Sequence, residues 1–363
     1  MKILVLMKRF GTNKDLVMEN FGRQVRIFEE LKNLGHNVDF LCMDYKKLES
    51  KMVRKNGISY FIEPFGMGKF NSFLKKLNFL LKHNRYDVLV GTTSPALGII
   101  GYYYSKRHKI KFAYELQDAY DIYGEYKIPL LRLIDRYVVK NSDVVICVSN
   151  TLKKRIRKYR KKPIYVVQNG IEGNLFKPLD RIKCRKNLNL PKGAKIIVYV
   201  GLISKIKGFD VLLSSFEKLR KRYEDCILLV SGKVDKGIEL NHENLIFKEL
   251  AKRTQVVDAI NAADVAVIPN PRNMFTEFCF PYKLVEYMAC KVPIVATQVG
   301  DTGLLLKGYE GSLCMPSDSN DLAEKIIAKL EKASRVDYGK DLQKFKWEIL
   351  GRKFERALIM RHS

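Results

Sequence analysis

The chain lacks the usual markers of a secreted, membrane-spanning or metal-binding protein. Its seven cysteines are scattered without a C-x-x-C spacing, which predicts reduced, mostly buried thiols and no zinc site. The start, MKILVLMKRF, runs into polar sequence without a small-residue cleavage site, so we expect no signal peptide and a cytoplasmic location. The longest uncharged run, 88–105, is interrupted by glycines and a proline, which disfavours a membrane span. The five histidines form no convincing triad or metal set: His36, His83, His108, His242 and His362.

Acidic residues are few beside the basic ones. The chain has 66 Lys and Arg against 39 Asp and Glu, a net charge of +27, and residues 1–178 alone have 34 against 16. A positive net charge of this size attracts nucleic acid, anionic membranes or phosphorylated ligands, and the charge alone does not distinguish among these partners. A lysine-rich or thermophilic proteome is the alternative that requires no partner.

Apolar strands alternate with helical patterns along most of the chain, which predicts an α/β fold with parallel sheets. The length of 363 residues and 47% apolar composition allow two domains, and we find no repeat, low-complexity tract or heptad seam. We expect two Rossmann-like, doubly wound domains facing a cleft, at 1–178 and 179–340, followed by an amphipathic helical segment at 341–363. The expected strands are 2–7, 37–42, 87–91, 111–116, 143–149, 164–168, 195–201, 226–231, 245–247, 264–269 and 293–297.

The most informative stretch is 263–300, ADVAVIPNPRNMFTEFCFPYKLVEYMACKVPIVATQVG. It predicts a short strand, a polar loop holding Glu277, a helix carrying Lys283 and Glu286, and a second strand ending in Gly300. Open α/β sheets bind ligands where strands end and helices begin, so we expect a polyhydroxylated or phosphorylated ligand here. Alternatively, Glu286 is an exposed charge paired with Lys283, and Glu277 lies in a solvated loop.

A second signal favours phosphate. The strand KIIVYV runs into Gly201, and Lys205 and Lys207 follow directly before a helix that begins at residue 209. Free N–H groups and the dipole at a helix N-terminus favour an anion, and the lysines add charge, although this arrangement also recurs by chance. Gly22, at the start of the first helix, would allow close approach of a phosphate. Without a full G-x-G-x-x-G or a Walker loop it is as well explained as a helix-start glycine.

Several ordered motifs together resemble the retaining family-4 glycosyltransferases, and the resemblance spans nearly the whole chain. The donor-side segments are VYVGLISKIKGFDVLLSSFEKL and PYKLVEYMACKVPIVATQVG, and the other matching segments are NFGRQVRIFEELKNLGHNV, SDVVICVSNTLKKRI and VVQNGIEGNLFKP. The resemblance implies a GT-B fold in which the second domain holds a nucleotide sugar, the first holds the acceptor, and the C-terminal helix crosses back onto the first.

Site roles follow from the resemblance at matching positions. Glu286 would bind the ribose hydroxyls, Lys207 the diphosphate, and Gly22 would let the first-domain backbone close over it. Lys205 is a further candidate for the diphosphate, and Lys283 reaches either a phosphate or Glu286. The rest of the expected donor site is formed by Gly201, Glu277, Phe278, Cys279, Phe280 and Leu284.

Three departures from the family pattern limit this transfer. Eight residues separate Glu277 and Glu286 where the family usually has seven, so Glu277 is displaced or is not the equivalent residue. Leu202 stands where many relatives have arginine, so the second diphosphate cation is Lys205 or comes from elsewhere. The family's first-domain histidine is absent from YELQD, and Asp118 becomes the candidate acceptor-side group, unless it caps a turn or helix.

The expected chemistry is glycosyl transfer with retention and without a metal or other cofactor. Lys207 and the helix N-terminus stabilise charge on the leaving diphosphate, which helps accept the acceptor's proton on the same face. The acceptor is expected to be a glycan or lipid-linked precursor at an anionic membrane. The basic amphipathic segment 69–83, with Lys69 and Lys82 off its apolar face, and the basic cluster 153–162 are the candidate membrane contacts, although most such stripes face a core. The alternatives are a basic nucleic-acid-binding protein, which lacks a reading motif, and a GT-B nucleotide-sugar epimerase.

Overall fold

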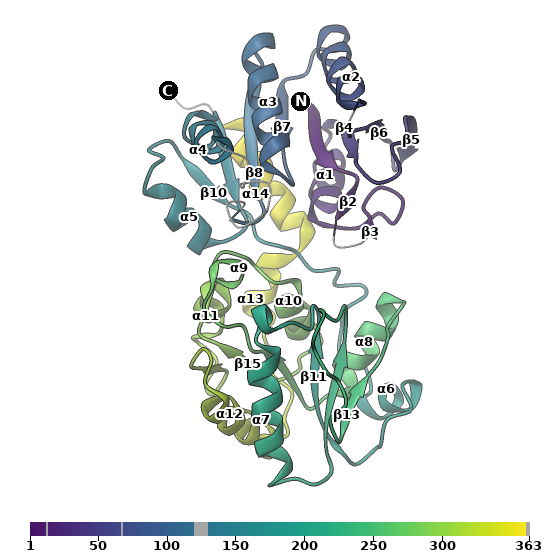
Figure 1. Cartoon of the computed structure of the whole chain (residues 1–363), viewed down its shortest axis with the longest axis vertical. Coiled ribbons are helices and arrows are strands. Elements are labelled where there is room, and N and C mark those ends of the chain that lie inside the picture. Colours follow the sequence, from purple (N-terminus) through teal and green to yellow (C-terminus); the bar gives the residue numbers. More distant parts are fainter. Residues whose placement is uncertain (12–13, 67, 120–129, 361–363) are drawn as a thin grey trace. The chain divides into compact units, whose positions relative to one another are not determined.

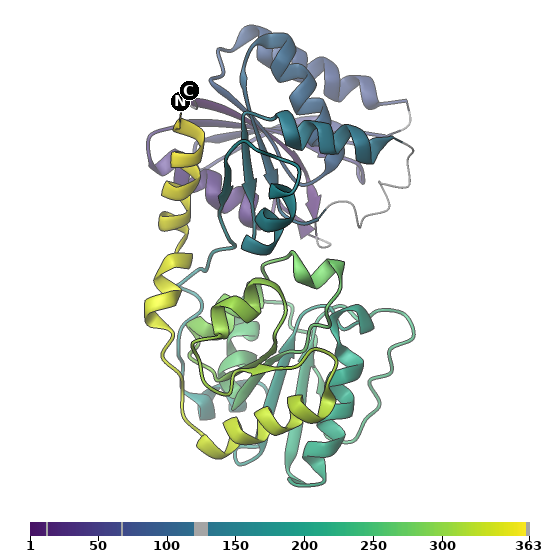
Figure 2. The same ribbon diagram turned by 90° about the vertical axis from the view of Figure 1, so that its left-hand side faces the viewer.

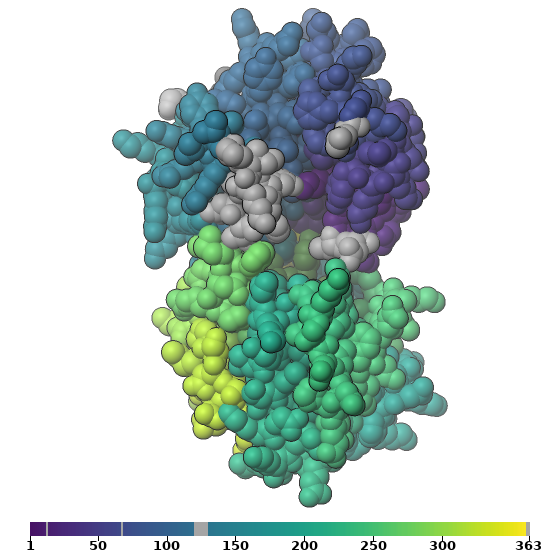
Figure 3. Space-filling model, in the orientation of Figure 1, coloured from purple at the N-terminus to yellow at the C-terminus, as the bar shows by residue number. Residues whose placement is uncertain are grey.

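The computed structural model divides the chain into two compact units, which are described separately below. The first unit comprises residues 1–168 and 347–363, and the second comprises 169–346. The structure describes all residues except 12–13, 67, 120–129 and 361–363, which are grey in Figure 3. The division falls before the predicted change at Pro178, and the Ile171 N–H donates a hydrogen bond to the Phe345 carbonyl within the second unit.

An eight-stranded sheet forms the centre of the first unit, in the order β10-β9-β8-β7-β1-β4-β6-β5 (Figure 1). Its pairings are parallel except that β5 runs antiparallel to β6 at one edge, a hairpin that the sequence pattern did not predict. The central strands are buried along their length, as parallel strands covered on both faces require. The strands are β1 Lys2–Lys8, β4 Asn37–Asp44, β5 Lys51–Lys55, β6 Ile58–Pro64, β7 Val88–Gly91, β8 Lys111–Leu116, β9 Val144–Cys147 and β10 Ile164–Val166, with a small antiparallel pair β2 Phe10–Gly11 and β3 Lys14–Asp15.

The helices of this unit are α1 Arg23–Asn33, α2 Phe70–His83, α3 Pro95–His108, α4 Leu131–Asn141, α5 Asn150–Arg157 and α14 Trp347–Ile359. Figure 2 shows α14, in yellow, beside α1. Phe28 and Phe354 meet edge to face there, with ring centroids 5.2 Å apart. The last helix of the chain therefore belongs to the unit that contains its first strand.

The apolar face of α2 does not form the membrane-facing stripe that we considered for 69–83. Phe73 and Leu77 are fully buried and Leu81 is nearly so, because this face packs on the core of the first unit. Phe70 and Phe79 are exposed, but Phe73 and Leu77, which lie between them in the sequence, are buried. The two exposed residues therefore form no continuous apolar stripe. The core-facing alternative is the correct one for this helix.

The second unit contains a six-stranded, wholly parallel sheet in the order β13-β12-β11-β14-β15-β16. Its strands are β11 Lys195–Val200, β12 Cys226–Ser231, β13 Leu245–Phe247, β14 Val265–Ile268, β15 Ile294–Thr297 and β16 Leu313–Cys314. Its helices are α6 Arg181–Asn187, α7 Phe209–Arg220, α8 Arg253–Ala262, α9 Met274–Glu277, α10 Tyr282–Ala289, α11 Gly300–Leu306, α12 Ser319–Lys332 and α13 Gly339–Leu342, with 3-10 turns η3 Lys205–Lys207 and η4 Gln343–Phe345. Both sheets confirm the predicted α/β class with two doubly wound units.

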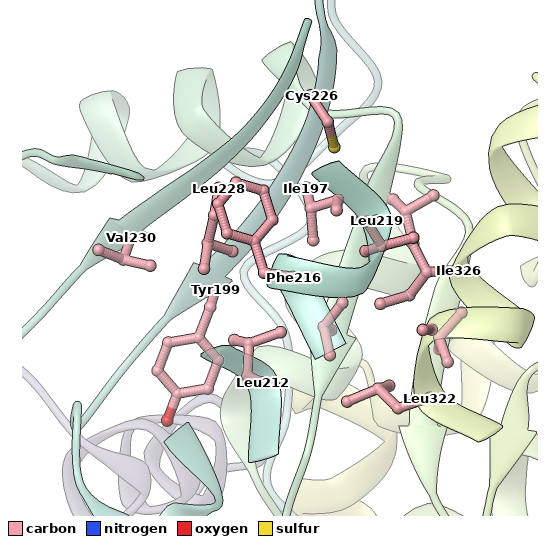
Figure 4. Packing of buried hydrophobic residues seen from close by; sticks show 14 of the residues in the cluster. Ile197, Tyr199, Leu212, Phe216, Leu219, Cys226, Leu228, Val230, Leu322 and Ile326 are labelled. Atoms are coloured by element: carbon pink, nitrogen blue, oxygen red, sulfur yellow. The ribbon is translucent and has the colours of Figure 1, made fainter. Parts of the chain in front are cut away.

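The core of the second unit lies between its sheet and the helices α7 and α12 (Figure 4). Phe216 and Leu219 of α7 and Ile326 of α12 are buried against strand residues such as Leu228. The apolar spacing of α7 follows the helical period, so one of its faces is buried while Asp210, Ser214 and Glu217 are exposed. This packing holds the sheet rigid beneath the loops that follow β11 and β14.

Candidate functional site

The predicted donor residues of the second unit gather at the carboxyl ends of β11 and β14. From β11 the strand order continues to β12 on one side and to β14 on the other, so these two strands flank the topological switch point. Loops diverge at such a point and leave room for a ligand above the strand ends. The loop after β11 contains Gly201 and η3, and the loop after β14 leads into α9.

Glycines allow these loops to pack closely. A Cβ at Gly208 would lie 1.9 Å from the Pro269 carbonyl oxygen, and one at Gly232 would lie 1.9 Å from the Gly201 carbonyl oxygen. Both glycines also have a positive φ, which disfavours any L side chain. The β11 loop is thus pressed against the loops that follow β12 and β14.

Lys207 and Lys205 differ in their surroundings, although both lie in the η3 turn. The Lys207 ammonium is half-buried and donates a 3.4 Å hydrogen bond to the Phe275 carbonyl, whereas Lys205 is exposed. Helix α7 begins at Phe209 directly after this turn, and no side chain caps its N-terminus. Lys207 therefore stands beside N–H groups that favour an anion, while Lys205 points into solvent.

Lys283 provides the second positive charge of the site. Its Nζ lies 3.9 Å from the centroid of the Tyr199 ring, and a Cβ at Gly201 would lie 2.6 Å from it. The Tyr199 hydroxyl donates a 2.6 Å hydrogen bond to the Leu202 carbonyl, which fixes this ring. Burial, together with the nearby charge of Lys207, lowers the pKa of Lys283 to about 7, although the charge of Glu286 opposes this shift. Gly201, Lys207 and Lys283 thus come together after the carboxyl end of β11.

Glu286 lies one turn after Lys283 on α10, and its side chain is only 16% exposed. Burial raises the pKa of Glu286 to about 7, while the charges of Arg253 and Lys283 oppose this shift. Arg253 approaches Glu286 at 4.0 Å, binds Glu172 at 2.5 Å, and stacks on the Phe176 ring. Glu286 is therefore not a solvated surface charge, and its partner is Arg253 from α8 rather than a helical pair with Lys283.

Sequence reasoning missed Arg253 and Glu172 in this cluster. Arg253 begins α8, and no local pattern marks it among the many cations of the chain. Glu172 lies in the segment VVQNGIEGNLFKP, which carried part of the family resemblance but suggested no role for this residue. Only tertiary contact brings the two residues to Glu286.

Glu277 lies in a short helix, α9, where we expected a polar loop. The Asn273 side chain accepts hydrogen bonds from the N–H groups of Phe275 and Thr276 and so caps this helix. Gly300 packs against the Glu277 carbonyl, which a Cβ would approach to 2.7 Å, and it begins α11 instead of ending a strand. The Asn273 cap at the start of α9 and the contact of Gly300 with the Glu277 carbonyl at its end hold this short helix in place.

The remaining donor candidates separate into two groups. Phe278 and Cys279 are half-buried beside Glu277. Phe280 and Leu284 are buried, and the Phe280 ring packs on Phe345 with centroids 5.1 Å apart. The structure places Phe280 and Leu284 in the packing beneath the site, and a direct sugar contact from any of the four stays a prediction.

Gly22 and Asp118 belong to the first unit. Gly22 precedes α1 with φ 100°, and no side chain caps this helix. Arg23 is buried and donates a 2.6 Å hydrogen bond to Glu115, which also accepts one from Thr92. This network, at the carboxyl ends of β7 and β8, holds the start of α1.

Asp118 is half-buried and lines a pocket of about 270 Å³ between α4 and α5. The cations Arg132, Arg136, Arg155 and Lys158 line the same pocket. Its surroundings are therefore basic, which suits a ligand with negative charge. In the described part of the chain, no three His, Cys, Asp or Glu residues are grouped as metal ligands.

Comparison with known proteins gives consistent matches. Residues 25–174 match the sequence profile described as Glycosyltransferase Family 4, and residues 194–332 match Glycosyl transferases group 1. An uncharacterized glycosyltransferase of Methanocaldococcus jannaschii is 27% identical over 80% of this chain and 78% of its own length. The N-acetyl-alpha-D-glucosaminyl L-malate synthase of Bacillus anthracis is 24% identical over 56% of this chain, which spans about half the length of that relative (54%).

Solved structures share the fold at lower identity. The sucrose-phosphate synthase of Thermosynechococcus elongatus has a TM-score of 0.77 at 17% identity, covering 98% of this chain and 97% of its own. The HepE protein of Anabaena, solved with UDP, has a TM-score of 0.76 at 16% identity, covering 99% of both chains. At such identity these matches establish the fold and leave the substrates open.

Proposed function

Because this chain belongs to the glycosyltransferases of family 4 and group 1, with a GT-B fold, we propose that it transfers a sugar with retention from a nucleotide-diphosphate sugar, without a metal ion. The observation that carries the donor part of this proposal is the meeting of Lys207, Lys283 and Gly201 at the switch point of the second sheet. Two lysines and an uncapped helix N-terminus there suit a diphosphate.

Lys283 is our candidate for the second diphosphate cation. Leu202, at the position where relatives often have arginine, has no charge to offer. The Lys283 Nζ reaches Gly201 from α10, whereas Lys205 points into solvent. We therefore assign the two diphosphate cations to Lys207 and Lys283. A bound diphosphate would supply the negative charge that the buried Lys283 lacks, and so would raise its pKa.

Glu286 suits the ribose. A carboxylate accepts hydrogen bonds from two neighbouring hydroxyl groups, and Arg253 favours its ionised form. Its position one turn from Lys283 would set the distance between the ribose and diphosphate ends of the nucleotide. Glu277, one residue further from Glu286 than in relatives, is our candidate for the sugar itself.

The proposed reaction breaks the bond between the anomeric carbon and the diphosphate and forms one between that carbon and an acceptor oxygen. The leaving diphosphate accepts the acceptor's proton on the same face, so no covalent enzyme intermediate is required. Lys207 and Lys283 stabilise the charge that develops on the leaving group. Asp118, in its basic pocket, is the candidate to orient an acceptor, for which we propose a lipid-linked or other glycan precursor.

Donor binding tests this proposal through the two lysines of η3. Isothermal titration of nucleotide sugars should show Lys207→Ala binding roughly tenfold to a hundredfold more weakly, because a charge-assisted hydrogen bond is lost. The matched control, Lys205→Ala, removes an exposed cation two residues away and should change affinity by about twofold or less. Unchanged donor binding in both Lys207→Ala and Glu286→Gln would refute the site.

Product analysis then separates transfer from the epimerase alternative. A transferase leaves its sugar on an acceptor, while an epimerase releases a free sugar and requires no acceptor. The family matches favour the transferase over a nucleic-acid-binding protein. Tight, strongly salt-dependent nucleic-acid binding without any turnover of nucleotide sugar would reverse that preference.

A further inference from the structure

Helix α4 of the first unit exposes a stripe of large apolar residues. Leu130, at its N-cap, is 68% exposed, and Leu133, Ile134 and Tyr137 are 65%, 45% and 59% exposed. Their spacing of three, four and seven residues places them on one side of the helix. Asp135, Val138 and Val139 of α4 are buried, so the exposed stripe is additional to the residues that anchor the helix.

The apolar surface extends onto the neighbouring helix α3. The Tyr102 and Tyr137 rings meet edge to face, with centroids 6.1 Å apart, and Tyr103 of α3 is 61% exposed. Isolated exposed apolar residues are common on proteins, but a contiguous group of this kind marks an interaction surface. We call Leu130, Leu133, Ile134 and Tyr137 the α4 surface.

Positive charge borders the α4 surface. Arg132, Arg136 and Lys140 follow one another at intervals of four residues, and all three are exposed. The single acidic residue of α4, Asp135, is buried and accepts a 2.6 Å hydrogen bond from the Tyr114 hydroxyl. The helix therefore presents apolar side chains and cations to solvent, and no carboxylate.

Helix α5 adds further cations, and α4 and α5 both line the pocket described above. Between Val144 and Ile171 the chain has eight basic residues and no acidic one. Most of these cations are exposed: Lys153, Lys154, Arg157, Lys158, Lys161 and Lys162. The basic cluster that we predicted at 153–162 therefore continues the charge of α4.

We propose that the α4 surface docks this protein on an anionic phospholipid bilayer. The apolar stripe would lie at the boundary of headgroups and acyl chains, while Arg132, Arg136, Lys140 and the α5 cations bind lipid phosphates. A second copy of the chain would bring like charges together, and nucleic acid would leave the apolar stripe exposed. This inference does not rest on the proposed donor site, since α4 and α5 belong to the first unit. It shares Arg132 and Arg136 with the pocket proposed for the acceptor.

Vesicle co-sedimentation tests the inference with the full chain. We expect binding to phosphatidylglycerol vesicles, weakened by salt, and little binding to phosphatidylcholine vesicles. The triple variant Arg132→Gln/Arg136→Gln/Lys140→Gln should lose roughly a hundredfold in affinity at low salt, and Leu133→Ser/Tyr137→Ser should lose about tenfold or more. The matched control is Phe79→Ser/Lys82→Gln on α2, which removes one exposed apolar residue and one cation and should retain affinity.

Nucleotide-sugar binding by each variant serves as the folding check and keeps the two proposals distinct. Vesicle binding without any nucleotide binding in the wild type would refute the transferase proposal and leave the docking inference intact. Full vesicle affinity in both α4 variants would overturn the inference, as would equal binding to both lipids. Concentration-dependent dimerisation abolished by Leu133→Ser/Tyr137→Ser, without vesicle binding, would overturn it in favour of a second copy.

Discussion

At the scale of single residues, the proposed donor site contains two ionisable groups whose pKa values burial shifts in opposite directions. Burial lowers the pKa of Lys283 from its ordinary value and raises that of Glu286, so both lie at about 7. The proposed roles require Lys283 protonated, to hold a diphosphate, and Glu286 ionised, to accept ribose hydroxyls. Donor affinity should therefore depend on pH near neutrality.

We predict that nucleotide-sugar affinity is greatest near pH 7. As pH falls below 7, Glu286 takes up a proton and loses its acceptor role. As pH rises above 7, Lys283 loses its proton and its charge. The affinity thus falls along an acidic limb below pH 7 and an alkaline limb above it. On each limb the affinity falls by up to about tenfold per pH unit, the limit for one coupled proton. Titration calorimetry of a nucleotide sugar from pH 5.5 to 9 measures both limbs.

Two variants identify which group titrates in each limb of this pH dependence. Glu286→Gln should flatten the acidic limb only, and Lys283→Met the alkaline limb only, each on a lower overall affinity. An affinity that stays constant across this range in the wild type would contradict the prediction. A limb that persists in its assigned variant would show that another group titrates.

At the scale of elements, helix α14, near the end of the chain, packs on helix α1, near its beginning. Gly351 allows close contact with α1, since a Cβ there would lie 2.5 Å from Glu30 Cβ. Phe354 is fully buried and packs on Phe28, while Ile359 of the same helix is 54% exposed. The helix thus offers a buried and an exposed apolar residue for comparison.

We predict that Phe354→Ala lowers the free energy of unfolding of the first unit by about 3–5 kcal/mol, because it leaves a cavity between α1 and α14. Ile359→Ala is the matched control and should cost less than about 1 kcal/mol, as exposed substitutions do. Urea unfolding followed by circular dichroism measures both changes. Similar values for the two variants would mean that α14 does not pack on α1 in solution.

Local patterns predicted most elements because buried parallel strands are short apolar runs and their helices are amphipathic. The expected strands at 226–231 and 245–247 coincide with β12 and β13. The hairpin β5–β6 was missed because β5, at the edge of its sheet, is largely exposed and carries Lys51, Arg54 and Lys55. The capped helix α9 was missed because a single turn has too few residues to show a helical period.

At the scale of the whole molecule, the seven cysteines report on packing in both units. None forms a disulfide, and all are buried except Cys279, which is half-buried. Burial raises the pKa of the six buried thiols, to about 12 for Cys226 and Cys290, so these six are poor nucleophiles at neutral pH. The expectation of mostly buried thiols is confirmed.

We predict that Ellman's reagent labels at most one thiol of the native protein within minutes, and all seven in urea. Cys279→Ser should abolish the native reaction. A nucleotide sugar should slow it, if Cys279 lines the sugar as we expect. Rapid native labelling of several thiols would show that the cores open on the timescale of the reaction.

The α/β class, the two sheets and the glycosyltransferase family could all be predicted from the sequence alone, because strand and helix periods and ordered motifs are local properties of the chain. The sequence also predicted that Gly201, Lys207, Lys283 and Glu286 belong to one site. Tertiary structure decided their partners. Lys283 over Tyr199, Glu286 beside Arg253, and the burial of the α2 stripe all depend on residues far apart in the chain. Amphipathic helices such as α2 and α4 look alike in sequence, and only packing determines which apolar side faces the core and which faces solvent.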